Sequence, residues 1–329
     1  MVHVLSMGVE TIKAPLVTIA IPTRNRAGSY LPGTLTSALR QTHRRLQIIV
    51  ADNGSTDHTA DLVAQVSDSR LRYYRHDQTI RANENFNFCL SHADGDYFAL
   101  LHDDDQMDDD FVEACIRAAH NQTDLGMIRT GARTIDAAGA TLSEIPNRVG
   151  GLTTAQYFRG WFTLKTALYH SRLFNTGRLK QLGGFQSKYL LLQDVAAEVR
   201  LAAMFGRVDI EAVKFSVRRH GGAMTASIDV ADWCDECLDV LGLMRGLVPP
   251  EEAATIGREG KRFFARLSYY RANAMEPASG RIKAYGIVYR KFGCLPSRYS
   301  LTQAFGHTSA YTGLRAAKRA WWRVLAREA

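Results

Sequence analysis

The sequence predicts an α/β fold, in which a mostly parallel sheet is flanked by helices and followed by a helical C-terminal region. Three observations support this class. Between residues 16 and 120 short apolar runs alternate with segments of helical period. Polar clusters come directly after the apolar runs, and beyond about Thr225 helical periods continue, broken by prolines. Such alternation indicates strands joined by crossover helices, with helices on both faces of the sheet.

The N-terminal elements are expected in a repeating strand-helix order. We predict strands at residues 16–21, 46–51, 71–75 and 97–101, and helices at 29–41, 57–66, 81–92 and 109–120. Asp57 is placed to cap the second helix. The acids before the fourth helix, Asp108, Asp109 and Asp110, are expected to form a solvated loop and an acidic cap.

The second half of the chain has a looser pattern. Residues 137–151 are expected to form a loop, and residues 155–182 carry several aromatic and basic side chains. A strong helical stretch covers residues 194–202, and a strand is predicted at 208–217, ending at Arg218 and Arg219.

Composition indicates a folded globular protein. Of 329 residues, 46% are hydrophobic and 22% are charged, which excludes disorder as the main state. No apolar run is long enough to cross a bilayer, and residues 1–15 lack a signal-peptide pattern, so a cytoplasmic location is expected. Five cysteines without framework spacing agree with a reducing compartment. Cys234 and Cys237 are spaced either as metal ligands or as small side chains packed on one helix face.

The positive charge is concentrated near the C-terminus. The formal net charge is +8, and residues 281–329 hold ten Lys and Arg against one acid, Glu328. Residues 311–329 form an amphipathic helical pattern with Trp321 on the apolar side and arginines on the other. This pattern is typical of a helix in a membrane interface, and equally of a terminal helix docked on its own domain. No nucleic-acid-binding motif is present, so nucleic acid is not an expected partner.

Three polar clusters each follow a predicted strand. They are residues 22–26 (PTRNR), 52–57 (DNGSTD) and 102–105 (HDDD). In open α/β sheets ligands bind beyond the carboxyl ends of the strands. We therefore expect the three clusters to line one edge of the sheet.

The acids in these clusters suggest a metal and a nucleotide. Consecutive carboxylates at Asp103, Asp104 and Asp105 suit a divalent cation that also binds a diphosphate, although a solvated loop has the same composition. Asp52 is placed to accept hydrogen bonds from a base or ribose. With Gly54 supplying the turn, the same residues also make an ordinary turn and helix cap.

These clusters, in this order, resemble family 2 glycosyltransferases of the GT-A fold. The resemblance continues through residues 183–185 (GGF), 193–194 (QD) and 218–220 (RRH), and covers roughly residues 15–225. It implies a GT-A domain at residues 1–225 and leaves a helical C-terminal region at 226–329 with the basic tail. It also implies inverting transfer of a sugar from a nucleotide-diphosphate donor, UDP- or dTDP-linked, to an acceptor hydroxyl.

The resemblance also assigns roles to individual residues. Asp194 falls at the position of the general base. A divalent metal, Mn²⁺ or Mg²⁺, would be held by Asp104 and Asp105. The residues expected to contact the donor are Pro22, Thr23, Arg24, Asn25, Asp52, Asp103 and His220.

Two positions depart from the family pattern. His102 stands where an acid is usual, and Gln193 where the base is commonly preceded by Glu. Simpler interpretations of the second half remain open: Asp194 is also placed to cap its helix, and His220 to end a strand in a polar residue. Arg218 and Arg219 are placed either to contact phosphate or to solvate the sheet edge.

The implied partners are a nucleotide sugar and a glycan or lipid-linked acceptor in surface polysaccharide or lipopolysaccharide synthesis. An acceptor on a lipid diphosphate would place the enzyme at the inner face of the cytoplasmic membrane. Two alternatives use similar residues: a nucleotidyltransferase acting on sugar phosphates, and a non-catalytic carbohydrate-binding or scaffold protein. The donor sugar, the linkage and the oligomeric state are not encoded in these motifs.

Overall fold

A computed structural model describes residues 14–120, 122, 124–168, 171–222, 228–275 and 277–296. Contacts divide the chain into two compact units. Unit 1 comprises the described residues of Met1–Gly150, Ala167–Phe185 and Met204–Arg219, and unit 2 those of Gly151–Thr166, Gln186–Ala203 and His220–Ala329. Two segments before residue 225 therefore group with the C-terminal helices. The functional boundary at residue 225 stays a prediction.

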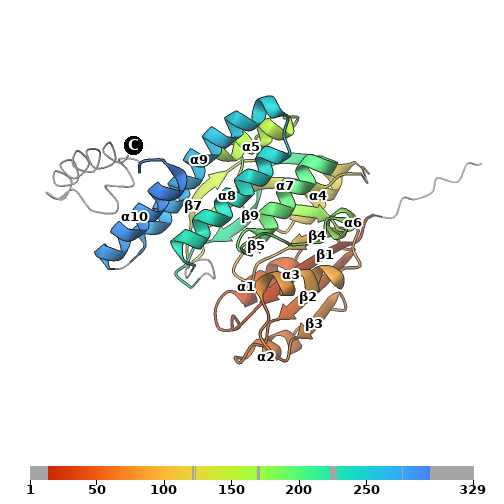
Figure 1. Cartoon of the computed structure of the whole chain (residues 1–329). Coiled ribbons are helices and arrows are strands. Elements are labelled where there is room, and N and C mark those ends of the chain that lie inside the picture. The colour runs from red at the N-terminus through yellow and green to blue at the C-terminus, as the bar shows by residue number, and fades with distance from the viewer. Residues whose placement is uncertain are drawn as a thin grey trace, which may run out of the picture. The chain divides into compact units, whose positions relative to one another are not determined.

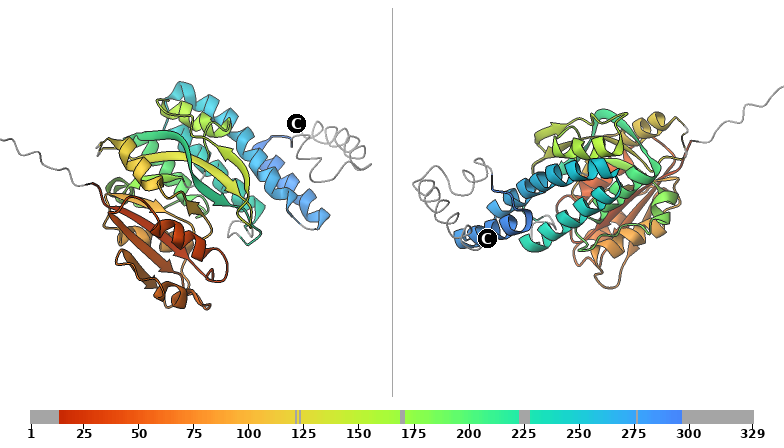
Figure 2. Two further views of the ribbon diagram at one scale, coloured as in Figure 1. Left: turned by 180° about the vertical axis from the view of Figure 1, so that it is seen from behind. Right: turned by 45° about the horizontal axis from the view of Figure 1, so that its top comes forward.

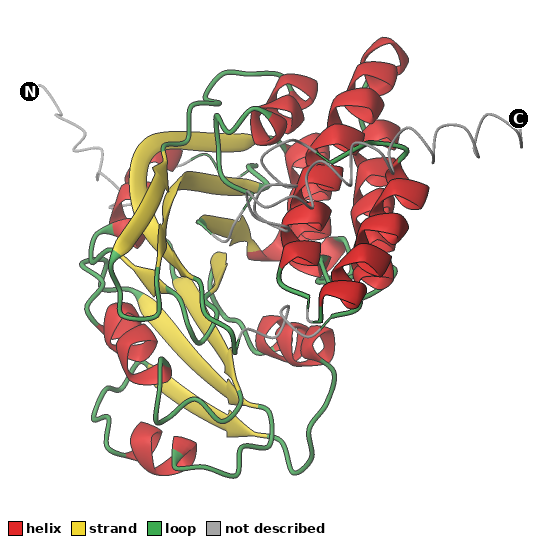
Figure 3. Cartoon of the chain, turned by 90° about the vertical axis from the view of Figure 1, so that its left-hand side faces the viewer, coloured by secondary structure: helices red, strands yellow, loops and turns green. Residues whose placement is uncertain are grey.

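Unit 1 is built on a nine-stranded sheet (Figure 3). The strand order is β3-β2-β1-β4-β8-β6-β9-β5, and β7 pairs with β6. The strands are β1 (Val17–Thr23), β2 (Leu46–Asp52), β3 (Leu71–Arg75), β4 (Tyr97–Leu100), β5 (Gln106–Met107), β6 (Met127–Ile135), β7 (Thr141–Ile145), β8 (Arg172–Asn175) and β9 (Arg207–Arg218).

The half of the sheet formed by β1 to β4 agrees with the sequence prediction. Its strands pair in parallel, with β1 between β2 and β4. Thr23 lies opposite Asp52 in the register, so the first two strands end together. The helices that alternate with these strands (Figure 1) are α1 (Leu31–Leu39), α2 (Thr59–Ala64), α3 (Ala82–Ser91) and α4 (Phe111–Ala119).

Helices cover both faces of this half, as predicted. Alternate residues of β1, such as Val17 and Ile19, belong to a core cluster that includes side chains of α1 and α4. On the other face, the rings of Phe98 from β4 and Phe86 from α3 both contact Phe185, with centroids 5.9 Å away in each case. Successive side chains of a strand point to opposite faces of the sheet, so these strands pack against a layer of helices on each side.

The rest of the sheet is mixed, and here the sequence prediction fails in part. The predicted strand at 208–217 is confirmed as β9, which pairs with β6 in parallel. The predicted loop at 137–151 is wrong, because β7 lies within it and pairs with β6 antiparallel. All but the last residue of β7 are exposed. Its sequence therefore lacks the apolar run that reveals a buried strand.

The acids before α4 are not a simple solvated cap. Asp110 occupies the N-cap position without a side-chain capping bond. Each acid instead forms an ion pair with a base from elsewhere in unit 1: Asp108 with Arg133 at 2.6 Å, Asp109 with Arg40 at 2.6 Å and Asp110 with Lys214 at 2.7 Å. Long-range pairing of this kind has no local sequence signal. Asp57, by contrast, does accept a hydrogen bond from the backbone N–H of Thr59 at the start of α2.

Unit 2 is helical. It contains α5 (Thr154–Phe162), most of α7 (Gln193–Phe205), and the long helices α8 (Val230–Gly246), α9 (Pro250–Asn273) and α10 (Ala278–Phe292). The last three pack side by side (Figure 2). In the part of the chain that the structure describes, no helix is long and apolar enough to span a membrane. The predicted amphipathic helix at 311–329 lies outside the described residues.

Cys234 and Cys237 are both buried on α8. Burial raises the pKa of Cys234 to about 11 and raises the pKa of Cys237 well above its ordinary value. Within the described residues, these cysteines do not belong to any group of three or more His, Cys, Asp or Glu side chains that could hold a metal ion. The two cysteines thus pack as small apolar side chains.

Candidate active site

The structure brings the three strand-end clusters together at one edge of unit 1. The Thr23 hydroxyl donates to Asp103 Oδ2 at 2.8 Å, which joins the first cluster to the third. The Asn25 N–H donates to Ser55 Oγ at 2.9 Å, and Asn25 Oδ1 accepts from the Thr56 N–H at 2.7 Å. The first cluster is therefore hydrogen-bonded to both of the others.

The first cluster changes from buried to exposed along its length. Pro22 and Thr23 are buried at the end of β1, whereas Arg24 and Asn25 are exposed. Asn25 has a φ of 54°, in the left-handed region that few residues other than glycine and asparagine adopt. Its two hydrogen bonds to the second cluster hold this conformation, and the chain turns sharply there.

Asp52 is fully buried, and its carboxylate is already used within unit 1. Oδ1 accepts from the Ser55 N–H at 2.8 Å, and Oδ2 accepts from the Tyr73 hydroxyl at 2.6 Å, with Arg75 Nε 4.0 Å away. Burial and the neighbouring carboxylate raise the pKa of Tyr73, which therefore stays a donor. Gly54 has the positive φ, 69°, that the turn requires. A nucleotide contact of Asp52 stays a prediction.

Asp103 is the acid that contacts the first cluster. Besides Thr23, the Arg24 N–H approaches Oδ2 at 3.3 Å, and Arg26 Nε lies 3.9 Å from Oδ1. Burial and the charge of Asp104 raise the pKa of Asp103 to about 6. The carboxylate thus lies in a crowded negative environment that an added cation would relieve.

Asp105 lies deeper and is held by β9. It is 2% exposed, and its Oδ1 accepts from the Arg218 N–H at 2.8 Å. Arg218 Nε donates to the Asp104 carbonyl at 3.0 Å, and its guanidinium lies 4.9 Å from the Tyr30 ring. Burial and the charge of Asp104 raise the pKa of Asp105 well above its ordinary value. Arg218 thus links β9 to the acid cluster through main-chain and side-chain hydrogen bonds, and its role toward phosphate stays a prediction.

The donor set fits Mg²⁺ or Mn²⁺ held together with a diphosphate. Within the described ranges, no group of three or more His, Cys, Asp or Glu side chains is arranged to hold a metal alone. Mg²⁺, however, is commonly bound by one or two carboxylates, with substrate phosphates completing its coordination. The neighbouring carboxylates of Asp104 and Asp105 provide that number of oxygen ligands.

His102, which stands where the family usually has an acid, packs against aromatic side chains. Its ring contacts Phe86 edge-on, with centroids 5.5 Å apart, so it takes part in aromatic packing. Phe185 joins the same aromatic group. The Phe185 N–H donates to Asn87 Oδ1 at 2.8 Å. Gly184, with a φ of 75°, lies so close to Asn87 that a Cβ there would be 2.2 Å from this oxygen.

Asp194 lies in unit 2, in the first turn of α7, and is 5% exposed. The segment before it is held by Glu236, a fully buried residue of α8. Glu236 accepts from the Tyr189 N–H at 2.8 Å and from the Leu192 N–H at 3.1 Å. Sequence reasoning missed Glu236, since an acid in a helix usually faces solvent. His220 follows β9 and is half-buried.

Comparison with known proteins agrees with this geometry. Residues 18–180 match the model of glycosyl transferase family 2. The chain carries a family 2 glycosyltransferase domain. Over 178 residues it is 27% identical to the hyaluronan synthase of Pasteurella multocida, an alignment that covers 54% of this chain and 18% of that protein. The family 2 domain is thus shared with a relative several times longer.

Solved structures with this fold are similar over most of the chain. S. aureus TarS 1–349, solved in complex with UDP-GlcNAc, has a TM-score of 0.63 at 13% identity, covering 84% of this chain and 81% of that one. The mannosyltransferase PcManGT from Pyrobaculum calidifontis, solved with GDP-Man and Mn²⁺, has a TM-score of 0.56 at 16% identity, covering 94% and 88%. These matches confirm the GT-A fold predicted for the family 2 domain.

Proposed function

We propose that the chain is an inverting glycosyltransferase that moves a sugar from a UDP- or dTDP-linked donor to a hydroxyl of a growing glycan. The observation that carries the proposal is the linked edge of unit 1, where Thr23 and Asp103 join the first and third strand ends at 2.8 Å. This arrangement places backbone N–H groups, two arginines and carboxylates at one sheet edge. A metal-bound diphosphate needs those groups.

On the donor side, Arg24 and Arg26 supply positive charge beside the acid cluster, and Asp103 is the proposed contact to the donor. Pro22, Thr23, Asn25, Asp52 and His220 are the further residues proposed to contact it. Asp104 and Asp105 are the proposed ligands of Mn²⁺ or Mg²⁺. The cation would offset the charge that develops on the leaving diphosphate. The Arg218 N–H holds the Asp105 carboxylate, and the Arg218 guanidinium holds the Asp104 backbone carbonyl.

On the acceptor side, Asp194 is the proposed base. The acceptor oxygen attacks the anomeric carbon as its proton passes to the Asp194 carboxylate. The new C–O bond forms opposite the bond that breaks, and the nucleoside diphosphate leaves with that electron pair. The configuration at the anomeric carbon is therefore inverted.

The glycan class of the acceptor is supported by the relative named as a hyaluronan synthase. The UDP-linked donor is supported by the complex of TarS with UDP-GlcNAc. A lipid-linked acceptor and a location at the inner face of the membrane remain part of the same proposal.

The test is a panel of nucleotide sugars incubated with the full chain and Mn²⁺ or Mg²⁺, with released nucleotide identified by chromatography. We expect slow release of nucleoside diphosphate from one donor, and loss of this release in Asp103→Asn. Formation of nucleoside triphosphate from pyrophosphate and a nucleotide sugar would indicate a nucleotidyltransferase. Donor binding without turnover, with or without acceptor oligosaccharides, would indicate a carbohydrate-binding protein.

A further inference from the structure

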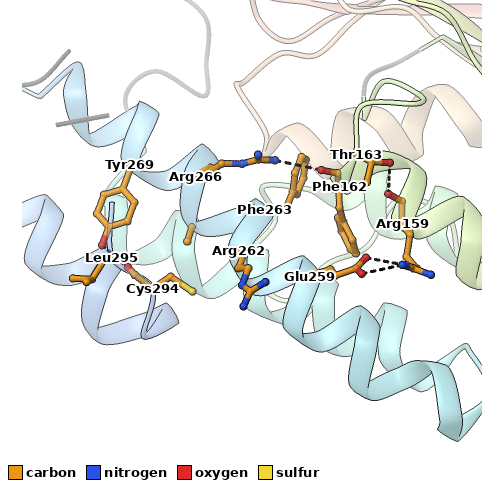
Figure 4. A pocket seen from close by; sticks show the side chains of 11 residues that line it. Arg159, Phe162, Thr163, Glu259, Arg262, Phe263, Arg266, Tyr269, Cys294 and Leu295 are labelled. Atoms are coloured by element: carbon orange, nitrogen blue, oxygen red, sulfur yellow. Dashed lines mark hydrogen bonds and ion pairs between the residues drawn. The ribbon is translucent and has the colours of Figure 1, made fainter. Parts of the chain in front are cut away.

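A pocket of about 410 Å³ lies on α9 within unit 2 (Figure 4). It is bordered by the end of α5, by one side of α9 and by the residues that follow α10. Three guanidinium groups line it, from Arg159, Arg262 and Arg266. The apolar part of the lining comes from Phe162, Phe263, Ala265, Tyr269, Cys294 and Leu295.

The pocket has a polar end and an apolar end. At one end Arg159 forms a two-pronged ion pair with Glu259, at 2.8 and 2.9 Å. At the other end Tyr269 lies beside Cys294 and Leu295, and the Tyr269 hydroxyl donates to the Cys294 carbonyl at 2.8 Å (Figure 4). Leu295 is a large hydrophobic residue that is 48% exposed. A ligand with two chemically different ends matches this lining.

The positive charge of the pocket is only partly neutralised. Glu259 pairs with Arg159. Arg266 donates to the Phe162 carbonyl at 3.3 Å, a neutral acceptor. Arg262 makes no hydrogen bond or ion pair within the part of the chain that the structure describes. Two guanidinium groups thus remain for an anion, and the guanidinium fork suits phosphate oxygens.

We propose that this pocket binds the phosphate headgroup of a lipid. Arg262 and Arg266 contact the phosphate, and the first carbons of the lipid chain lie along Tyr269 and Leu295. A sugar would need more polar partners than the pocket provides, because Glu259 and Thr163 are its only side chains with acceptor oxygens apart from the Tyr269 hydroxyl. This binding site is additional to the proposed sugar transfer and does not depend on it.

The C-terminal segment of this chain is too basic to be the occupant of the pocket. Residues 297–329 contain six basic residues and one acid, Glu328. A segment of that charge is repelled by Arg262 and Arg266. It is attracted, however, to the same anionic membrane surface as the pocket.

Cys294 offers a direct measurement of occupancy. It lines the pocket and is half-buried, whereas the other four cysteines are buried. The rate at which a water-soluble thiol reagent modifies Cys294 is measured on the full chain, with the site identified by mass spectrometry. We expect vesicles containing phosphatidic acid to slow this rate several-fold, and neither phosphatidylcholine vesicles nor inorganic phosphate to do so. Equal protection by phosphatidylcholine, or protection by inorganic phosphate alone, would overturn the proposal.

A matched pair of variants separates the pocket from general surface charge. R262Q/R266Q should lose the protection of Cys294 and bind phosphatidic acid vesicles roughly thirtyfold more weakly, as expected for two basic residues at an anionic surface. R258Q/K261Q removes the same charge from exposed positions of α9 outside the pocket lining, and should retain the protection. Loss of the Cys294 protection in both variants would contradict a specific site. If R262Q/R266Q melts early, R262Q alone carries the test.

Discussion

In unit 1 the buried carboxylates lie at the ends of strands, whereas in unit 2 they lie on helices. Asp52 and Asp105 accept hydrogen bonds from residues of neighbouring strands and loops at one sheet edge. Glu198 and Glu236 are fully buried on helices of unit 2, where they accept from the Tyr157 hydroxyl and from backbone N–H groups. The first arrangement gathers several acids at one sheet edge, and the second uses single carboxylates to fix segments of the interior.

This difference suggests two ways of placing a reactive acid. In unit 1 the acids of the proposed donor site share one sheet edge, and loss of one member changes the charge that remains. In unit 2 Asp194 is placed by the segment that precedes it, and this segment depends on Glu236. Substitutions in unit 1 should therefore lower donor affinity, whereas substitutions in unit 2 should lower the transfer rate.

The largest expected effect is that of Asp194→Asn. Removing the proposed base should lower the transfer rate by roughly 10² to 10⁴-fold, the usual contribution of a general base. Donor affinity, measured by calorimetry, should stay unchanged. Asp232→Asn, at an exposed position of α8, is the control and should transfer normally. An unchanged transfer rate in Asp194→Asn would show that Asp194 is not the base. It would also contradict the expectation that unit 2 controls turnover.

The next effect is that of Asp104→Ala. We expect donor affinity in the presence of Mn²⁺ to fall by about 10²-fold, because one of the two proposed metal ligands is lost. The melting temperature should change little, since the Asp104 side chain is half-buried. Asp124→Ala, at an acid whose side chain is 98% exposed, is the matched control. Unchanged Mn²⁺-dependent affinity in Asp104→Ala would contradict the metal site.

A smaller effect is expected for Glu236→Gln. The amide cannot accept both backbone N–H groups as a carboxylate does, and we expect a loss of about 2 kcal/mol in unfolding free energy. The transfer rate should fall more than donor affinity, because residues 189–192 lead directly into Asp194. Chemical denaturation and steady-state kinetics measure the two quantities. A fall in donor affinity as large as the fall in rate would mean that Glu236 does not act through Asp194.

The smallest effect is expected for Tyr73→Phe. The hydrogen bond to Asp52 is lost, which should cost about 1 kcal/mol in unfolding free energy. A lower denaturation midpoint with an unchanged slope checks this value. Tyr74→Phe is the control, because within the described ranges the Tyr74 hydroxyl makes no hydrogen bond. Equal destabilisation by both variants would show that the buried Asp52 does not depend on Tyr73.

Sequence reasoning succeeded where a signal was local. The strands β1, β2 and β4 are apolar runs with a polar cluster after each of them, and both features are visible in short windows. It failed for β7, whose exposed residues carry no such run, and for the ion pairs of Asp108, Asp109 and Asp110. It also missed Glu236, whose partners precede it by more than forty residues.

The sequence by itself determined the alternation of strands and helices in the first 120 residues, the strand-end acids and the resemblance to family 2, because hydrophobic period and strand ends are properties of neighbouring residues. Only the tertiary structure decided which polar groups hold those acids. Arg218 reaches Asp105 across more than a hundred residues, and Thr23 reaches Asp103 across eighty. Such hydrogen bonds depend on strand order and register, and chain connectivity alone does not determine which distant strands meet.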